Sequence, residues 1–163
     1  MYTEASREII IQSVGIGLLL SLIFTETLGL AAGGMVVPGY VALMLHHPLR
    51  IVGTIIVSLL TFLTIKILSN YMFIYGRRRT VLVILVGFLF GWMSRELLII
   101  QTNYLTLELQ TIGLIIPGLI ANWMERQGVI KTISTMIIAA IIIRLILMII
   151  TGGEVFIREE WVI

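Results

Sequence analysis

The amino-acid sequence predicts an all-α polytopic membrane protein made of two similar halves. Hydrophobic residues make up 59% of the chain, charged residues only 12%, and the mean hydropathy is +1.10, far above the composition of a soluble domain. The charges gather at the ends of long apolar runs, as they do in a bundle of membrane helices joined by short loops. We therefore predict one transmembrane domain over residues 1–163 and no separate soluble domain.

The prediction of two halves comes from a repeated nine-residue frame at 34–42 and 113–121, 79 residues apart. Each frame reads small residue, three large apolar residues, Pro-Gly, two large apolar residues and Ala, and together they hold two of the chain's three prolines. This recurrence predicts an internal duplication, with repeat one at about 9–79 and repeat two at about 80–150. Residues 151–163 are expected to form a short interfacial tail.

Each frame is typical of a broken membrane helix. Proline has no N–H and its ring crowds the carbonyl four residues earlier, and the following glycine tolerates a positive φ that would let the chain leave the helix. If the helix continued, the first Gly, the Pro and the Ala would form a stripe that another helix can approach closely. We expect the two frames to meet near the centre of the fold, although prolines that only shape packing remain an alternative. The frame residues are Gly34, Pro38, Gly39, Ala42, Gly113, Pro117, Gly118 and Ala121.

The first half contains two predicted spans on either side of its frame. Residues 9–25 are apolar enough and long enough to cross a bilayer, and this run ends near Glu26. The frame segment 28–45 follows and ends at a His-His-Pro sequence. Residues 49–68 form the second span, with Arg50 and Lys66 near its ends, where long side chains can reach the interface.

The second half repeats this order. It begins after Gly76 with three consecutive arginines that follow aromatic residues, a pattern typical of a cytoplasmic interfacial anchor. Residues 80–100 form a third span, the frame segment 111–124 is too short to cross even as an unbroken helix, and 132–150 form the last span. The only charge in this last span is Arg144, which we interpret as a side chain that reaches the interface.

Two topologies follow from the frames. If both are re-entrant, four spans place the two termini and the three arginines at 77–79, the arginine triplet, on one side. This side is cytoplasmic by the positive-inside rule. If both cross, six spans result, the triplet lies opposite the termini, and the halves are inverted repeats with a site near the midplane. We favour four spans.

Few residues suggest a chemical role. Glu26 is a candidate intramembrane acid because a charge at membrane depth is costly, the alternative being a carboxylate at the water boundary. Arg77, Arg78 and Arg79 are candidates for contact with a partner or a polyanion, the alternative being attraction to anionic lipid.

The composition excludes several classes of function. The chain has no Cys and no Asp, no phosphate-binding Gly-rich motif, and no combination of nucleophile, base and orienting acid. We therefore predict no catalytic, cofactor-binding or metal-binding residues and no enzymatic activity of the chain by itself. A formal net charge of +2 is too small to indicate nucleic-acid binding.

The segment order and several motifs resemble the membrane subunit of the bacterial poly-γ-glutamate synthase, the PgsC/CapC family. The matching stretches are 20–26, 36–40, 75–78 and 112–122, with Gln127-Gly128 after them. The resemblance implies a multi-pass protein of the bacterial cell (inner) membrane that takes part in capsule biosynthesis. The charged tail and residues 101–110 follow no pattern of the family.

The resemblance also implies partners. They are an ATP-dependent amide ligase that joins glutamates through their side-chain carboxylates, a membrane-anchored extracellular subunit, and the acidic polyglutamate polymer. ATP and a divalent metal would belong to the ligase, and this chain would be a required subunit that supports the ligase and offers the polymer a path. A small independent transporter built from two repeats is the alternative function.

Overall fold

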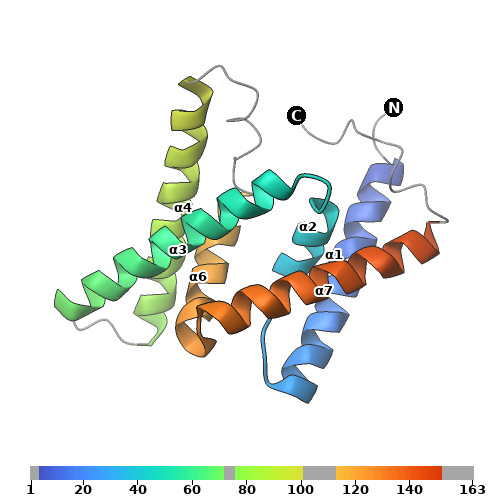
Figure 1. Ribbon diagram of the computed structural model, residues 1–163, viewed down its shortest axis with the longest axis horizontal. Coiled ribbons are helices and arrows are strands. Elements are labelled where there is room, and N and C mark those ends of the chain that lie inside the picture. Colours follow the sequence, from blue (N-terminus) through green and yellow to red (C-terminus); the bar gives the residue numbers. More distant parts are fainter. Residues whose placement is uncertain (1–3, 72–75, 101–112, 152–163) are drawn as a thin grey trace.

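The computed structural model describes residues 4–71, 76–100 and 113–151, and for 4–9, 71 and 95–100 the backbone only. The described part of the chain contains helices and no strand, which confirms the predicted fold class. The helices, labelled in Figure 1, are α1 (Glu4–Leu28), α2 (Val37–Leu43), α3 (Pro48–Tyr71), α4 (Arg77–Ile100), α6 (Ile116–Gln127) and α7 (Val129–Ile150). The predicted tail at 151–163 lies outside the described residues except for Thr151.

Three described helical segments are long and apolar enough to cross a membrane, namely Ile10–Leu28, Pro48–Asn70 and Val129–Ile150. They agree with three of the four predicted spans. Helix α4 has 24 residues, but its described side chains include the arginine triplet at its start, and it does not belong to this set.

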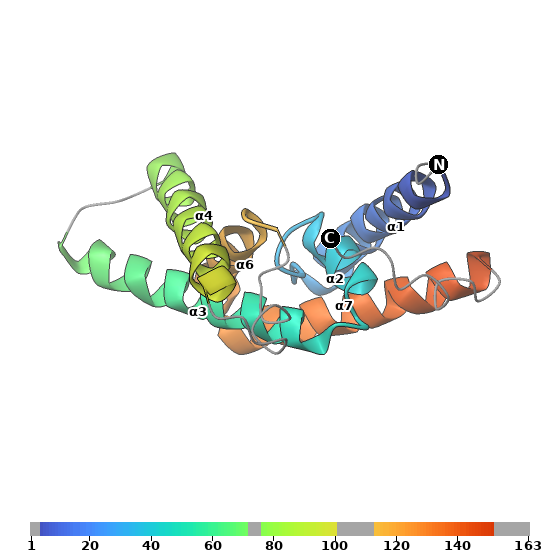
Figure 2. The ribbon, with the colours of Figure 1, turned by 90° about the horizontal axis from the view of Figure 1, so that it is seen from above.

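In each half of the chain, the first helix and the frame helix pack on the long helix of the other half. Helices α1 and α2 pack on α7 from the second half, whereas α4 and α6 pack on α3 from the first half. Figure 2 shows α3 and α7 along the base, with one pair of helices above each. In Figure 1, α1 and α4 run in opposite directions, as do α3 and α7.

The structure corrects the predicted position of the break in each frame. The prolines do not interrupt a helix, because α2 begins at Val37 and α6 at Ile116, which places each proline in a first turn, where its missing N–H costs little. The positive φ angles belong to Gly34 (123°) and Gly113 (69°), not to the glycines after the prolines. The chain is therefore non-helical before each proline and helical after it.

The glycines after the prolines serve close packing instead. A Cβ on Gly39 would lie 2.8 Å from the carbonyl oxygen of Ser13 on α1, and a Cβ on Gly118 would lie 2.8 Å from the Cα of Ile84 on α4. Real Cβ atoms do not approach other atoms so closely. Each frame helix therefore lies backbone against backbone on the first helix of its own half.

The two frames also share one hydrophobic core, to which Ala42 of the first frame belongs. Val37 and Val41 of α2 and Ile116 and Ile120 of α6 belong to the same buried cluster. Ala121 packs in a second cluster, and the nearest atoms to a Cβ on Gly113 belong to Ile116 of its own frame. Gly34 faces the second half, since the nearest atom to a Cβ there is Nε1 of Trp123 on α6, at 3.6 Å.

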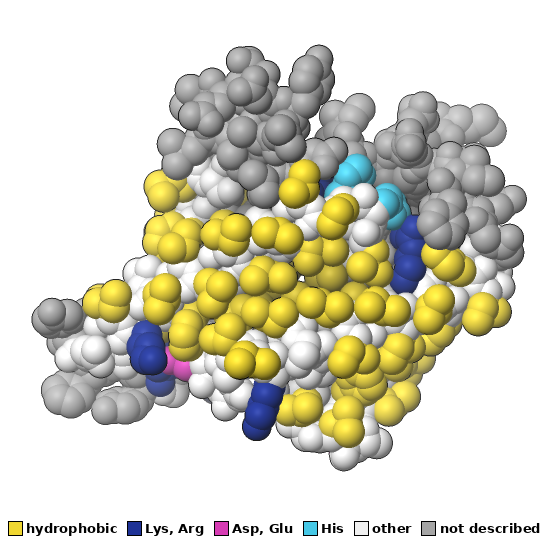
Figure 3. Space-filling model, in the orientation of Figure 1, with side chains coloured by type: hydrophobic (Ala, Val, Ile, Leu, Met, Phe, Trp, Pro, Cys, Tyr) yellow, Lys and Arg dark blue, Asp and Glu magenta, His cyan; other side chains and the backbone are white. Residues whose placement is uncertain are grey.

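The surface carries a broad apolar band. Large hydrophobic side chains are exposed along α3 and α7, including Leu60, Leu63, Ile138, Ile141 and Leu145. Figure 3 shows this band across the molecule, with histidines at its upper edge and Lys, Arg and acidic side chains at its lower edge. An apolar belt with polar borders is the surface that a bilayer covers.

The course of the chain favours the topology in which the frames cross. In Figure 1, α1 begins at the upper edge and ends at the lower edge, α2 returns upward, and α3 descends towards the edge where α4 begins. Helix α2 has seven residues, or about 10 Å, so the non-helical residues 29–36 have to complete the passage. The start of α1 and the start of α4 thus lie at opposite edges in Figure 1, as the six-span alternative expects, and the number of spans stays a prediction.

Cysteine labelling tests this topology directly, because the natural chain contains no Cys. We expect Pro48→Cys, at the start of α3, and Asn70→Cys, near its end, to react with an impermeant maleimide from opposite sides of the membrane. Both residues are exposed. In addition, Lys131→Cys should label from the same side as Asn70→Cys. Labelling of Lys131→Cys from the same side as Pro48→Cys would instead indicate that the frames are re-entrant.

Candidate functional site

Protein side chains bond to the backbone of the first frame and of the residues before it, as polar groups away from water require. The Ser13 hydroxyl donates to the Gly39 carbonyl at 2.8 Å, and the Ser21 hydroxyl donates to the Gly34 carbonyl at 3.4 Å. The side-chain amide of Gln127, at the end of α6, accepts from the N–H of Ala31 at 2.9 Å and donates to the carbonyl of the same residue. This bidentate contact fixes the first frame to the second half.

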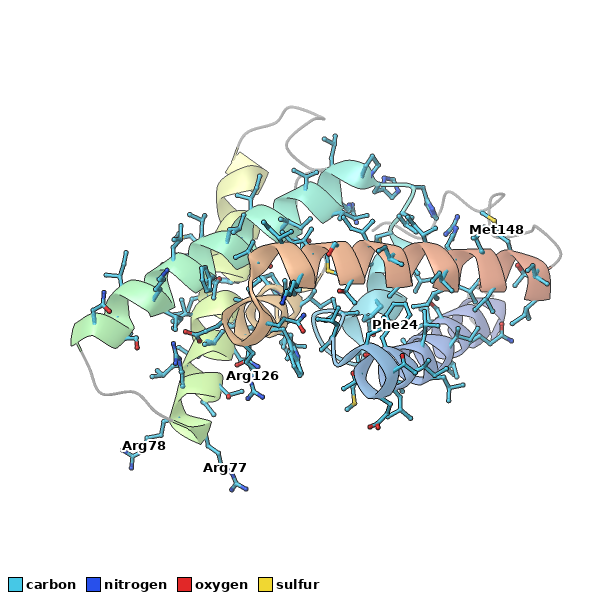
Figure 4. All side chains as sticks on the ribbon, turned by 60° about the horizontal axis from the view of Figure 1, so that its bottom comes forward. Phe24, Arg77, Arg78, Arg126 and Met148 are labelled. Carbon is cyan, nitrogen blue, oxygen red and sulfur yellow. The ribbon has the colours of Figure 1, made fainter. Side chains whose placement is uncertain are left out.

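The arginine triplet divides into two parts. Arg79 is half-buried and forms a salt bridge with Glu125, which ties the start of α4 to the end of α6. Arg77 and Arg78 are exposed, and Figure 4 shows both side chains pointing away from the body of the protein. Arg126 is also exposed, with its guanidinium 5.3 Å from the ring centre of Trp123. The surface available to a partner is therefore formed by Arg77, Arg78 and Arg126.

Glu26, the predicted intramembrane acid, is exposed near the end of α1. Glu26 lies within the apolar segment Ile10–Leu28, and both interpretations of this residue stay predictions. Among the described residues, no group of three or more His, Cys, Asp or Glu could hold a metal ion.

A second basic group lies at the opposite edge of the molecule, between the end of α2 and the start of α3. Arg144 of α7 is only 6% exposed, and its Nη1 donates to the carbonyl of Ala42 in α2 at 3.4 Å. The rings of His46 and His47 follow directly, with centroids 5.6 Å apart. Arg50 stands in the first turn of α3. We name Arg144, His46, His47 and Arg50 the histidine-edge cluster.

The cluster has a positive electrostatic character. Burial, followed by the neighbouring Arg144 and His47, holds the pKa of His46 below its ordinary value of 6.5. When nearby cations oppose the protonation of a group, an anion that binds beside it favours the protonated form. Sequence reasoning noted each member separately, but interpreted Arg144 as an interfacial anchor and did not bring the four residues together. The available signal was a lone cation well inside the last apolar run.

Comparison with known proteins identifies relatives over most of the chain. The family described as "Capsule biosynthesis CapC" matches residues 16–133. The chain is 38% identical to the "PGA biosynthesis protein CapC" of Bacillus subtilis (strain 168) over 121 residues, which cover 74% of this chain and 80% of the relative. It is 36% identical to the "Capsule biosynthesis protein CapC" of Bacillus anthracis over 124 residues, which cover 76% of this chain and 83% of the relative.

No solved structure matches this chain at a significant level. The fold and the positions of the arginine triplet and the histidine-edge cluster therefore come from this structure alone.

Proposed function

Because this chain belongs to the CapC family of capsule biosynthesis proteins, we propose that it is the integral membrane subunit of a poly-γ-glutamate synthase complex. In this role it supports an ATP-dependent amide ligase and gives the polymer a passage across the bacterial cell membrane. The observation that carries the proposal is the family match over residues 16–133, which includes both frames and the arginine triplet.

The proposal assigns the bond-forming chemistry to the ligase. Amide formation between glutamates requires an activated carboxylate, and the energy of ATP has to be coupled to that activation. The described residues of this chain offer hydroxyls that bond to their own helices, such as those of Thr54, Ser58 and Thr61, and no activated nucleophile. The ligase, with ATP and a divalent metal, forms the amide, and this chain provides a membrane platform.

We further propose that the two halves arose by internal duplication and are arranged as inverted repeats. The packing of the frames supports this proposal, since Gly39 contacts α1 around Gly17 as Gly118 contacts α4 around Gly87. Inverted repeats with irregular backbone near their interface are a common architecture for passage across a membrane. The same architecture also suits an independent transporter.

Co-expression distinguishes the two functions. We expect the tagged chain to purify together with the ligase from membranes, and polymer synthesis to stop in cells that lack this chain and resume when it is supplied. The membrane-anchored extracellular subunit should be recovered in the same complex. Normal polymer synthesis without the chain, together with substrate flux through the purified chain alone, would support the transporter instead.

Arg78 provides a finer test of ligase docking. Because its side chain is exposed while Arg79 is already paired with Glu125, we expect Arg78→Gln to lower ligase recovery several-fold at an unchanged membrane level. Arg78→Lys keeps the charge but not the forked donors of arginine, so it should also lower recovery. If the Lys variant is fully functional and the Gln variant fails only through lower membrane abundance, the triplet is a topology anchor.

A further inference from the structure

We propose that one exposed face of helix α6 binds the polyglutamate chain, with Asn122 as an amide-binding group and Arg126 as a carboxylate-binding group. The inference rests on the proposed function and adds a specific substrate site to it. The residues of this face are exposed or half-buried, whereas the rest of α6 is packed against other helices. Their spacing of three or four positions places them on one side of a helix. We name these residues the open face, and they are the N-cap Ile115 together with Leu119, Asn122, Trp123 and Arg126.

The neighbours of α6 determine where the open face lies. On one side, Gly118 packs with its backbone against α4. On the other side, Gln127 bonds to Ala31, and the indole nitrogen of Trp123 would lie 3.6 Å from a Cβ on Gly34. Figure 2 shows α6 between α4 and the non-helical segment before α2. The open face is therefore bounded by both halves of the chain, as a passage between the halves requires.

Asn122 is a polar residue at a depth where polar groups are costly. It lies five residues before the end of α6, which is about 8 Å along a helix, and it is half-buried. A carboxamide that leaves water without a partner costs free energy. The polar interactions of described α6 side chains belong to Gln127, Glu125 and Arg126, and no described group bonds to the amide of Asn122. Its donors and its acceptor are thus available to a ligand.

The first half of the chain shows that packing does not require an amide at this position. The residue 79 positions before Asn122, in the spacing of the two frames, is Leu43 in α2. Leu43 is also half-buried and packs against the hydrophobic core. An aliphatic side chain is therefore sufficient in one half, and the asparagine of the other half calls for a separate explanation.

The backbone beside the open face gives a second, independent observation. Residues 32–36 are not helical, and backbone of this kind is tolerated at membrane depth only where protein buries it or where it lines water. Protein buries Gly33 and Gly34, whereas Met35 is 63% exposed and Val36 39% exposed. The second condition thus fits the last two residues, and a hydrated path beside the open face satisfies it.

The polymer has groups that match this face. Each γ-linked glutamate unit carries one backbone amide and one free α-carboxylate. The amide of Asn122 can donate to and accept from the polymer amide, while the guanidinium of Arg126 offers two parallel N–H donors to a carboxylate. The ring of Trp123, whose centre is 5.3 Å from that guanidinium, holds it beside the open face. An anionic lipid would pair with Arg126 only, because its acyl chains offer no partner to Asn122.

Binding by the purified full-length chain in detergent tests the site. The probes are two fluorescent glutamate decamers of equal charge, one γ-linked and one α-linked. In the γ-linked chain each carboxylate is attached next to a backbone amide, whereas in the α-linked chain it stands at the end of a flexible side chain. Only the γ-linked chain therefore presents an amide and a carboxylate together to Asn122 and Arg126. We expect Asn122→Leu to weaken γ-decamer binding about fivefold and to leave α-decamer binding unchanged. Arg126→Gln should weaken the binding of both decamers about tenfold.

Matched controls separate the site from general effects of polarity and charge. Asn70→Leu removes an exposed asparagine near the end of α3, and Lys66→Gln removes an exposed cation over the ring of Phe62. Both variants should bind the two decamers like the natural chain. If Asn122→Leu does not fold, Asn122→Ala takes its place, because the smaller side chain cannot overpack the face.

Three results would overturn the proposal. One is unchanged γ-decamer binding in the folded Asn122 variant. Another is an equal loss of both decamers in that variant, because the substitution would then act through the fold. The third is an Arg126→Gln variant that loses binding to phosphatidylglycerol vesicles but keeps decamer binding, which would identify a lipid headgroup site. Ligase recovery is measured in parallel: failure of the natural chain to recover the ligase overturns the proposed function, whereas recovered ligase with decamer binding independent of the open face overturns only this inference.

Discussion

Replacing Gly87 by alanine is expected to prevent stable folding of this protein. A Cβ on Gly87 would lie 2.4 Å from the Cα and 2.5 Å from the N of Gly118. Both atoms belong to backbone, so no side-chain rotation can relieve the overlap, and α4 and α6 would have to separate. Since overpacking of a core by a single group already costs about 1–3 kcal/mol, we expect a loss of at least about 3 kcal/mol here.

Gly15→Ala is the matched control, because it introduces the same methyl group in a helix. Outside the backbone of α1 and the two neighbouring residues, no described atom lies within 4 Å of a Cβ at Gly15. Alanine is intrinsically the better helix former by about 1 kcal/mol, so this variant should be as stable as the natural chain or more stable. Gly17→Ala should fall between the two, since its Cβ would lie 3.0 Å from the Cα of Gly39.

The measurement is the yield of monodisperse protein and its thermal unfolding temperature in detergent. We expect Gly87→Ala to be absent or aggregated, Gly17→Ala to unfold at a lower temperature than the natural chain, and Gly15→Ala to be unaffected. Comparable unfolding temperatures for Gly87→Ala and Gly15→Ala would show that the close contact between α4 and α6 is not part of the native fold.

The sequence was sufficient to predict an all-helical fold with helices long and apolar enough to cross a membrane, because these features follow from local properties. Apolar runs define spans wherever they occur, and a Pro-Gly pair marks irregular backbone. The exact roles of the glycines were not predictable in the same way. Gly34 and Gly39 are both small and both near Pro38, and only the packing partner shows that one serves the turn and the other the contact with α1.

Sequence reasoning can find a candidate site whose residues are adjacent in the chain, but not one whose residues meet only through packing. Three consecutive arginines are visible in any sequence, but the pairing of Arg79 with Glu125 joins residues 46 positions apart and depends on how α4 meets α6. The histidine-edge cluster joins residues about 100 positions apart because α7 packs on the frame of the other half. No local pattern encodes that exchange of helices.

Gln127→Glu is the second change expected to have a large effect. In the natural protein the amide of Gln127 accepts from the N–H of Ala31, donates to its carbonyl, and also donates to the hydroxyl of Thr132 at 3.0 Å. A carboxylate has the same shape but no donor. The variant would lose two hydrogen bonds and place an anionic oxygen against the carbonyl of Ala31, which is itself buried.

Unsatisfied buried polar groups cost about 1–3 kcal/mol each, so we expect Gln127→Glu to destabilise the protein by about 2–4 kcal/mol at neutral pH. The residues before α2 should become accessible to added protease, since this contact holds them to the second half. Asn70→Asp, a change of amide to carboxylate at an exposed position near the end of α3, should have little effect on either measurement.

The loss of stability in Gln127→Glu should also depend on pH, and its direction follows from the hydrogen bonds to Ala31. A protonated carboxylic acid has one donor and one acceptor, as the amide contact with Ala31 requires, so the folded state favours the protonated form more than the unfolded state does. The stability lost at neutral pH should therefore return as the pH falls towards about 4.3, the ordinary value for Glu. We expect the difference in unfolding temperature between Gln127→Glu and the natural protein to shrink between pH 7 and about pH 5, while Asn70→Asp shows no such change. A deficit that stays constant over this range would mean that the variant acts by a route other than the loss of a donor to Ala31.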